Sequence, residues 1–250
     1  MRWTERQRAM LEEIGVRIWS PGERAPTALA EVAPRPAAPP TRSAPEPAAH
    51  RAAAGTLATL DWPELAAQAA ACTACPLCAG RTHSVFGAGH HQADWMIVGD
   101  APESEDDRSG EPFAGRAGQL LDNMLGALGL TRGAAAPSRQ VYVTHTVKCR
   151  PPGQRSPEAV EVARCEPFLL RQLQLARPRI ILAMGSVAAQ ALSGSTEAIG
   201  KLRGRVHRYA GIAVVVTHHP AYLLRQAQDK AEAWDDLCLA AQTLRDSSPA

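Results

Sequence analysis

The sequence predicts an α/β domain in which helices cover both faces of a central, mainly parallel four-stranded sheet, giving three α/β/α layers. Four short apolar runs have the length and composition of buried strands. They lie at residues 95–98, 141–147, 179–184 and 212–216. Helical spacing of apolar residues marks the stretches around these runs, at 117–128, 157–176, 187–192 and 230–244. Strands that alternate with helices are typical of a parallel sheet with both faces covered.

The length, charge and hydropathy of the chain indicate which broad class of protein it belongs to. Its 250 residues suffice for one domain of ordinary size with a tail, and the net charge of +2 does not by itself indicate nucleic acid. The first ten residues, MRWTERQRAM, carry charges where a signal peptide would be apolar. No run is long enough to span a bilayer. We expect a soluble, cytoplasmic protein that is monomeric and has no membrane contact.

The N-terminal part differs in composition from the rest. Residues 1–20 have apolar side chains near helical spacing, which predicts an amphipathic peptide. Residues 21–55 are dominated by alanine and proline and predict a semi-extended linker. The folded domain is expected at residues 56–247. We therefore expect the tethered peptide to be a docking element for a partner.

Unusual loops follow three of the predicted strands. Residues 99–106 follow the first, Thr144 and His145 close the second, and residues 217–220 follow the fourth. Ligands of parallel α/β sheets bind beyond the carboxyl ends of the strands. These three loops should therefore converge on one cleft.

Six cysteines without an export signal favour metal ligands or buried thiols over disulfides. Cys72 and Cys75 form a CxxC pair, and Cys149 and Cys165 form a pair separated by fifteen residues. Four thiolates suit structural zinc or an iron–sulfur cluster equally by ligand type. The loose second pair favours a cluster. The two other cysteines, Cys78 and Cys238, are not expected to be ligands.

Taken in order, these motifs resemble a known family. They are the CxxC at residues 72–75, VGDAPESEDDRSGEPFAGRAGQLLDNML, VYVTHTVKCRPP, Cys165 and HHPAYLLR. The series resembles the family 4 uracil-DNA glycosylases, the iron–sulfur members of that superfamily. The resemblance covers roughly residues 58–245. It implies a DNA repair enzyme that flips uracil out of DNA and hydrolyses its glycosidic bond, leaving an abasic site.

The resemblance implies a structural 4Fe-4S cluster that shapes a DNA-contacting region. Its ligands would be Cys72, Cys75, Cys149 and Cys165. Cations near these ligands are expected to contact phosphates. They are Lys148, Arg150 and Arg155. The loop with Leu223, Leu224 and Arg225 resembles the segment that probes the minor groove, and one of the two leucines is expected to pack inward.

The resemblance also implies roles in the reaction. Asp100 matches the family's water-activating carboxylate, usually Glu, with Glu105 and Asp106 as alternatives. His219 matches the histidine that stabilises negative charge on the departing base. The substrate-binding positions are Gly99, Ala101, Phe113 and His145, with Phe113 as the aromatic that stacks on uracil.

Three residues depart from the family pattern. Asp100 is shorter than Glu, and Glu103 replaces a glycine. The largest departure is His145, which stands where the family has an asparagine that reads uracil. An amide offers a donor and an acceptor side by side, whereas a ring nitrogen presents one of these at a time. Two alternatives therefore stay open: a glycosylase with a different base preference, and a non-catalytic iron–sulfur protein that binds DNA lesions.

A second, shorter resemblance concerns the N-terminus. The segment MLEEIGVRIWSPGER loosely resembles the start of the psi subunit of the bacterial clamp-loader complex. The resemblance implies that residues 1–20 bind a replication or repair protein.

Overall fold

The computed structural model describes residues 57–247. The docking peptide expected at residues 1–20 and the linker expected at 21–55 lie outside this range. Within the described residues, none of the helices combines the length and the apolar character needed to traverse a bilayer.

The sheet has six strands in the order β1-β3-β2-β4-β6-β5. Their bounds are β1 Ala88–Gly89, β2 Trp95–Gly99, β3 Val141–His145, β4 Ile180–Met184, β5 Val206–Tyr209 and β6 Ile212–Thr217. The four strands in the middle are parallel and match the four predicted runs, whereas β1 and β5 pair antiparallel at the edges. The predicted four-stranded sheet is thus wrong in strand number. β1 has only two residues, and β5 has no buried residue, so neither carries the apolar pattern of a core strand.

The described helices agree with the sequence pattern where that pattern is long. Their bounds are α3 Trp62–Ala71, α4 Ser104–Ser109, α5 Gly115–Ala127, α6 Ala159–Ala176, α7 Ser186–Ser193, α8 Ile199–Leu202, α9 Pro220–Leu223 and α10 Lys230–Asp246. The four predicted helical stretches correspond to α5, α6, α7 and α10 within two residues at each end. Part of the segment that follows β2, expected as a loop, forms α4.

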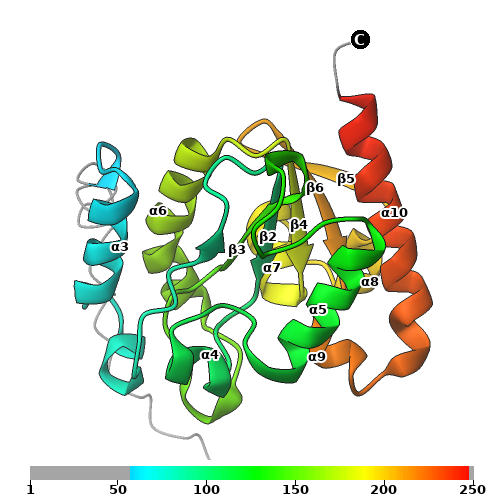
Figure 1. Ribbon diagram of the computed structural model, residues 1–250. Helices are drawn as coiled ribbons and strands as arrows, with labels where there is room; N and C mark the ends of the chain where they lie inside the picture. The colour runs from blue at the N-terminus through cyan, green and yellow to red at the C-terminus, as the bar shows by residue number, and fades with distance from the viewer. Residues whose placement is uncertain (1–56, 248–250) are drawn as a thin grey trace, which may run out of the picture. The chain divides into compact units, whose positions relative to one another are not determined.

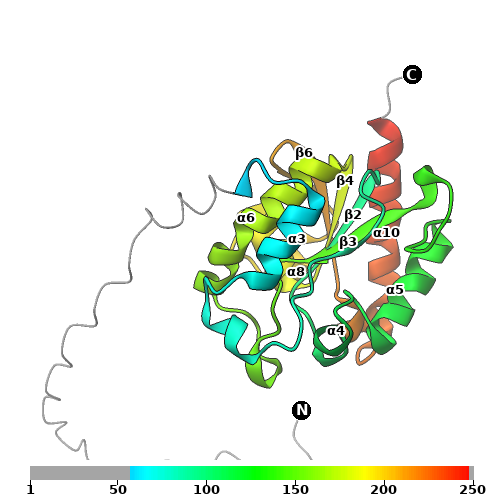
Figure 2. The same cartoon turned by 60° about the vertical axis from the view of Figure 1, so that its left-hand side comes forward.

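Helices cover both faces of the sheet, as the sequence predicts. One face packs on α6, α7 and α8 through a buried cluster that includes Leu173 and Leu192, with Trp62 of α3 against it. The other face packs on α5 and α10 through Leu125 and Leu237. Figure 1 shows α3 and α6 on one side of the strands and α5 and α10 on the other. Figure 2 shows α3 lying beside α6.

Side chains of each central strand alternate between these two clusters. In β2, for example, Met96 and Val98 belong to the first cluster, and Trp95 and Ile97 to the second. All five residues of β2, β3 and β4 are buried. The polar groups that follow these strands are therefore held at a rigid edge.

Candidate active site

The carboxyl ends of the parallel strands bring the unusual loops together. Gly99, the last residue of β2, pairs in register with His145 of β3 and with Met184 of β4. Met184 pairs in turn with Thr217, the last residue of β6. Asp106 of the first loop contacts His145 at the end of the second, and the rings of His145 and of His219, from the loop after β6, both stack on Phe113. These contacts confirm the expected convergence of the three loops.

Phe113 lies at the centre of this convergence. Its ring centroid is 4.7 Å from that of His145 and 5.2 Å from that of His219, with interplanar angles of 26° and 23°. The Phe113 side chain comes from the loop between α4 and α5, and only 2% of the residue is exposed. Three aromatic rings from three separate loops thus form one stacked group.

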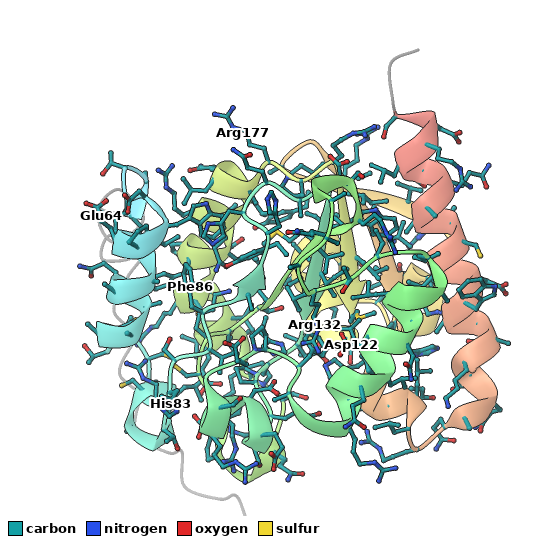
Figure 3. All side chains as sticks on the ribbon, in the orientation of Figure 1. Glu64, His83, Phe86, Asp122, Arg132 and Arg177 are labelled. Carbon is teal, nitrogen blue, oxygen red and sulfur yellow. The ribbon has the colours of Figure 1, made fainter. Side chains whose placement is uncertain are left out.

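The backbone of Phe113 is held in an unusual conformation. Its φ of 54° lies in the left-handed region, which costs a non-glycine residue about 1–3 kcal/mol. Arg132 donates hydrogen bonds to the carbonyls of Pro112, at 2.9 Å, and Phe113, at 3.3 Å. Asp122 holds Arg132 with two hydrogen bonds of 2.7 Å (Figure 3). A Cβ at Gly118 would lie 1.6 Å from the Phe113 carbonyl oxygen, so only glycine lets α5 approach this turn.

His219 is the residue that caps the start of α9. Its Nδ1 accepts a hydrogen bond of 3.2 Å from the backbone N–H of Ala221. Burial lowers the pKa of His219 to about 3, so the ring is neutral and its proton is on Nε2. Among the described residues, Nε2 is buried without a partner. His219 therefore presents a free hydrogen-bond donor beside Phe113.

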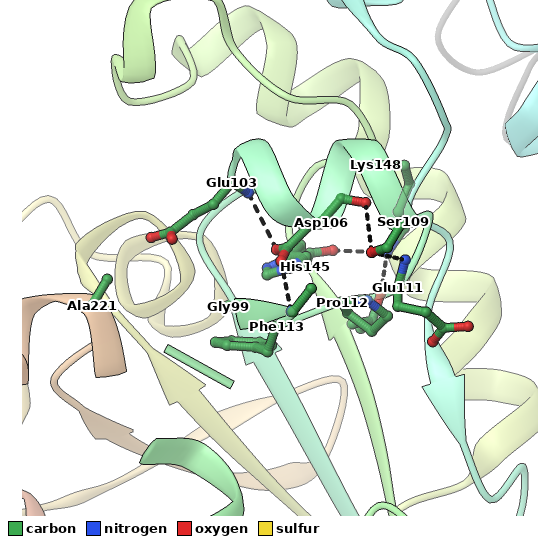
Figure 4. Close-up of polar contacts among 12 residues, drawn as sticks. Gly99, Glu103, Asp106, Ser109, Glu111, Pro112, Phe113, His145, Lys148 and Ala221 are labelled. Atoms are coloured by element: carbon green, nitrogen blue, oxygen red, sulfur yellow. Dashed lines mark hydrogen bonds and ion pairs between the residues drawn. The ribbon is translucent and has the colours of Figure 1, made fainter. Parts of the chain in front are cut away.

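His145 has the opposite arrangement of partners. Its Nε2 lies 3.0 Å from Oδ2 of Asp106, and both side chains are at most 2% exposed (Figure 4). In the part of the chain that the structure describes, Nδ1 is buried without a partner. A Cβ at Gly99 would lie 2.6 Å from this nitrogen and 2.5 Å from Cζ of Phe113. Gly99 thus leaves the room that both rings occupy.

The three candidate carboxylates have different environments. Asp100 accepts a hydrogen bond of 2.8 Å from the backbone N–H of Ala188 and further bonds from the first residues of α7. Burial raises the pKa of Asp100 to about 6. Glu105 is exposed and forms an ion pair with Arg108. Asp106 is occupied by His145, so each carboxylate has a distinct partner.

One of the departures noted in the sequence, Glu103, has a structural explanation. Glu103 is the N-cap residue of α4 with a φ of −88°, which needs no glycine. Its backbone N–H donates to Asp106 at 3.2 Å. Ala101, expected at the substrate, packs against the small cluster formed by Leu77, Val147 and Cys149.

The prediction that Lys148 contacts phosphates does not fit its position. The residue is 2% exposed, and its ammonium donates to Oγ1 of Thr144 at 2.6 Å, the carbonyl of His145 at 2.7 Å and Oε1 of Gln172 at 2.8 Å. These bonds use all three N–H groups of the ammonium. Its position next to Cys149 in the sequence suggested a surface cation and did not reveal that the side chain points inward. Lys148 instead supports the end of β3.

The other predicted DNA-contacting residues differ in exposure. The side chain of Arg150 is 32% exposed, and its nearest ion-pair partner is Asp107 at 4.0 Å. Arg155 is held by two hydrogen bonds, of 2.8 and 2.7 Å, to Glu161. After His219, Leu223 is buried whereas Leu224 is 39% exposed, so one of the two leucines packs inward as expected. Arg225 next to it is exposed.

A second site lies where the cysteines meet. Cys72, Cys75, Cys149 and Cys165 line one cavity, together with Cys78 and Lys148. In residues 57–247, no three His, Cys, Asp or Glu side chains form a ready-made metal site. The thiols instead surround a shared space, and soft sulfur donors fit a zinc ion or an iron–sulfur cluster.

Arg81 and Lys148 donate hydrogen bonds to two of these sulfurs. Arg81 donates a hydrogen bond of 3.0 Å to Sγ of Cys149, and the backbone N–H of Lys148 donates one of 3.3 Å to Sγ of Cys165. Burial raises the pKa of Cys165 to about 12, so a free thiol there stays protonated. A bound cation would replace that proton.

Sequence reasoning missed three residues of these sites. Arg132 clamps the Phe113 turn, Arg81 contacts a cysteine, and Asp106 contacts His145, a role different from the water activation considered for it. Asp106 stands in the acidic run SEDD, which resembles a solvated surface. The sequence could indicate this role of Asp106 only when it is considered together with His145, since a histidine at the end of a buried strand needs a polar partner.

Comparison with known families matches residues 86–238 to the uracil DNA glycosylase superfamily. The chain is 39% identical over 176 residues to a type-4 uracil-DNA glycosylase of Pyrobaculum aerophilum, covering 67% of this chain and 87% of that protein. Its identity to the type-4 enzyme of Thermotoga maritima is 40% over 161 residues, covering 64% and 81%. A type-5 uracil-DNA glycosylase of Pyrobaculum aerophilum is 38% identical over 140 residues, covering 51% and 61%.

Proposed function

The chain belongs to the uracil-DNA glycosylase superfamily, and from this premise we propose that it hydrolyses the N-glycosidic bond of uracil in DNA and leaves an abasic site. The observation that carries the proposal is the group around Phe113. A stacking ring with a free donor on His219 and a free ring nitrogen on His145 suits a flat base with polar edges.

In this reaction the flipped uracil stacks on Phe113. A water molecule attacks the sugar carbon while the bond to the base breaks, and the bonding electrons leave with uracil. His219 donates from Nε2 to a carbonyl oxygen of the departing base, where negative charge develops. Asp100, whose pKa of about 6 leaves it ionised at neutral pH, orients the water and stabilises the cationic sugar.

DNA is bound beside this site. Arg150 and Arg225 meet phosphates, and the exposed Leu224 occupies the space that the flipped nucleotide leaves. Residues 56–247 act as the catalytic domain, and residues 1–20 dock on a replication or repair protein through the linker.

A 4Fe-4S cluster is held by Cys72, Cys75, Cys149 and Cys165. The shared cavity and the soft sulfur donors support this assignment. When bound, the cluster cross-links α6, the start of the domain and the end of the β3 segment, and takes no part in bond breaking. Arg81 and the backbone of Lys148 hold two of the ligand sulfurs.

A gel assay of the full chain on an oligonucleotide with one uracil tests this function. Abasic product is expected with uracil, and parallel substrates with hypoxanthine or a thymine mismatch reveal any different base preference. His219→Ala should reduce the rate at least about 100-fold, because it removes the donor to the leaving base. The matched variant His218→Ala should retain most of the rate. Specific binding without product from any of the three substrates would contradict an enzymatic function and favour a lesion-binding protein.

A further inference from the structure

We propose that Asp106 is a positioning residue that fixes the tautomer of His145, making Nδ1 an acceptor that selects bases with an N–H on the edge that is read. This inference rests on the proposed function and deepens it. It assigns a specificity role to a carboxylate seven residues before Phe113 and to its contact with a histidine that stands in place of an amide.

The environment of Asp106 requires an ionised carboxylate. Its Oδ1 accepts from the backbone N–H of Ala114 at 2.7 Å, and its Oδ2 accepts from that of Glu103 at 3.2 Å. Burial alone would raise the pKa of Asp106, but the hydrogen bonds from His145 and from these backbone groups hold it below its ordinary value. Since the backbone groups can only donate, Asp106 serves as an acceptor. Figure 4 shows Glu103, Asp106 and His145 together.

The tautomer of His145 follows from that acceptor. Nε2 lies 3.0 Å from Oδ2 of Asp106 and must supply the proton of this bond. Burial lowers the pKa of His145, so the ring is neutral and has one N–H. Nδ1 is then left with its lone pair. This nitrogen is buried without a partner among residues 57–247, next to the Phe113 ring and Gly99.

Two neighbouring atoms of uracil match this arrangement. Its N3–H can donate to Nδ1 of His145, and a carbonyl oxygen beside it can accept from Nε2 of His219. Cytosine has a lone pair on N3, which would face the lone pair of Nδ1. Leaving one buried polar group unpaired in this way corresponds to a discrimination of about 10- to 100-fold. Uracil is therefore selected by an acceptor on His145 and a donor on His219. The asparagine that the family has at position 145 would supply both the donor and the acceptor from one amide.

Asp106→Asn should reverse this selection. The amide has one acceptor oxygen, and the bond from Ala114, at 2.7 Å, is shorter than the bond from Glu103, at 3.2 Å. The oxygen should therefore keep the Oδ1 position and the Glu103 bond should be lost, which places the NH₂ group opposite Nε2 of His145. The histidine must then accept at Nε2 and carry its proton on Nδ1. That proton would clash with N3–H of uracil and fit the lone pair of cytosine. Asp106→Glu keeps a carboxylate acceptor and should retain the original tautomer.

Two measurements on the full chain test the inference. Nitrogen-15 NMR of labelled histidines, with His145→Asn to assign the signal, should show protonated Nε2 and bare Nδ1 in the wild-type protein. Free uracil should shift the Nδ1 signal, and N3-methyluracil should not. In excision assays, the ratio of uracil to cytosine release should fall at least about tenfold in Asp106→Asn and recover in Asp106→Glu. Asp107→Asn, which alters a neighbouring buried carboxylate, should leave the ratio unchanged.

The outcomes separate this inference from the function on which it rests. A wild-type protein that releases uracil but carries the His145 proton on Nδ1 would overturn the inference alone. An unchanged ratio in a folded, active Asp106→Asn protein would overturn it as well. No uracil release by the wild-type protein would contradict the proposed function, whatever tautomer the NMR spectrum shows.

Discussion

The group around Phe113 and the cysteine cavity are two regions of one domain that are organised in different ways. Around Phe113, the polar side chains are held by partners from the chain itself. Asp106 is held by backbone N–H groups, and His219 by Ala221. In the cavity, the thiols face a shared space, and Arg81 and the backbone of Lys148 donate hydrogen bonds to the sulfurs of Cys149 and Cys165.

The two regions are joined by one short segment. His145 at the end of β3 belongs to the first region, and Cys149, four residues later, to the second. Lys148 lies between them and bonds to the His145 carbonyl with its side chain and to Cys165 with its backbone. The comparison shows that the protein itself fixes the polar groups of the first region, whereas the proposed cluster would fix the thiols of the second. Substitutions should therefore change rate in one and stability in the other.

The largest effect is expected in the cavity. Cys149→Ser should lose most of the bound iron and the visible colour. Its Tm should fall by about 10 °C, because loss of the cluster lowers the free energy of unfolding by several kcal/mol. For a domain of this size, each kcal/mol corresponds to about 2–4 °C in Tm. Iron analysis and thermal unfolding measure this. Cys78→Ser, in the same cavity, and Cys238→Ser, on the surface, should keep the iron. Iron loss in Cys78→Ser would show that the ligand set is different, and zinc without iron would exclude a cluster.

The next effect separates rate from stability. Asp100→Asn should lower the excision rate by about 10²- to 10⁴-fold without lowering Tm at pH 7. The folded-state pKa of Asp100, about 6, lies above its ordinary value, so this residue's contribution to stability falls as pH rises from about 4 through 6, and a neutral amide avoids that loss.

The same pKa sets the pH dependence of the wild-type rate. The rate should fall as pH drops below about 6, where Asp100 becomes protonated. Glu105→Gln, which alters an exposed carboxylate, should keep both the rate and its pH profile. A large loss of rate in Glu105→Gln and a small one in Asp100→Asn would show that Glu105, and not Asp100, orients the attacking water.

A smaller effect is expected at the junction of the two regions. Lys148→Met should destabilise the domain by about 1–3 kcal/mol, because three buried acceptors lose their donor. Denaturant unfolding measures the loss, with the exposed Lys201→Met as control. If Lys148 contacted phosphate instead, the variant would keep its stability and lose DNA affinity.

The smallest effect concerns DNA contact. Arg150→Ala should weaken DNA binding several-fold, because one phosphate contact is lost. The slope of the logarithm of the binding constant against the logarithm of salt concentration should become shallower by about 1. Arg155→Ala should change affinity less, since Glu161 already binds both terminal guanidinium nitrogens of Arg155. Titrations at several salt concentrations compare the two. Equal losses would mean that Arg155 leaves Glu161 when DNA binds.

Much of the fold follows from the sequence because buried parallel strands are apolar on both faces. The runs at residues 95–98 and 179–184 are of this kind. The edge strand β5 was missed because Val206 is exposed and its neighbours are at most half-buried. In the site, Phe113, His145 and His219 were identified through the family resemblance, and only His145 and His219 stand at or just after the ends of strands. Lys148 points inward to Gln172, 24 residues away, and Asp106 is buried against His145, 39 residues away. A local sequence pattern cannot predict contacts between residues so far apart in the chain.

The hydrogen bond between Asp106 and His145 has a consequence for how such a protein can evolve. A histidine at position 145 without the carboxylate would be free to carry its proton on either nitrogen. Under the proposed reading of the base, it would then accept cytosine as well as uracil. We therefore expect related chains that carry histidine at the position of His145 to carry a carboxylate at the position of Asp106.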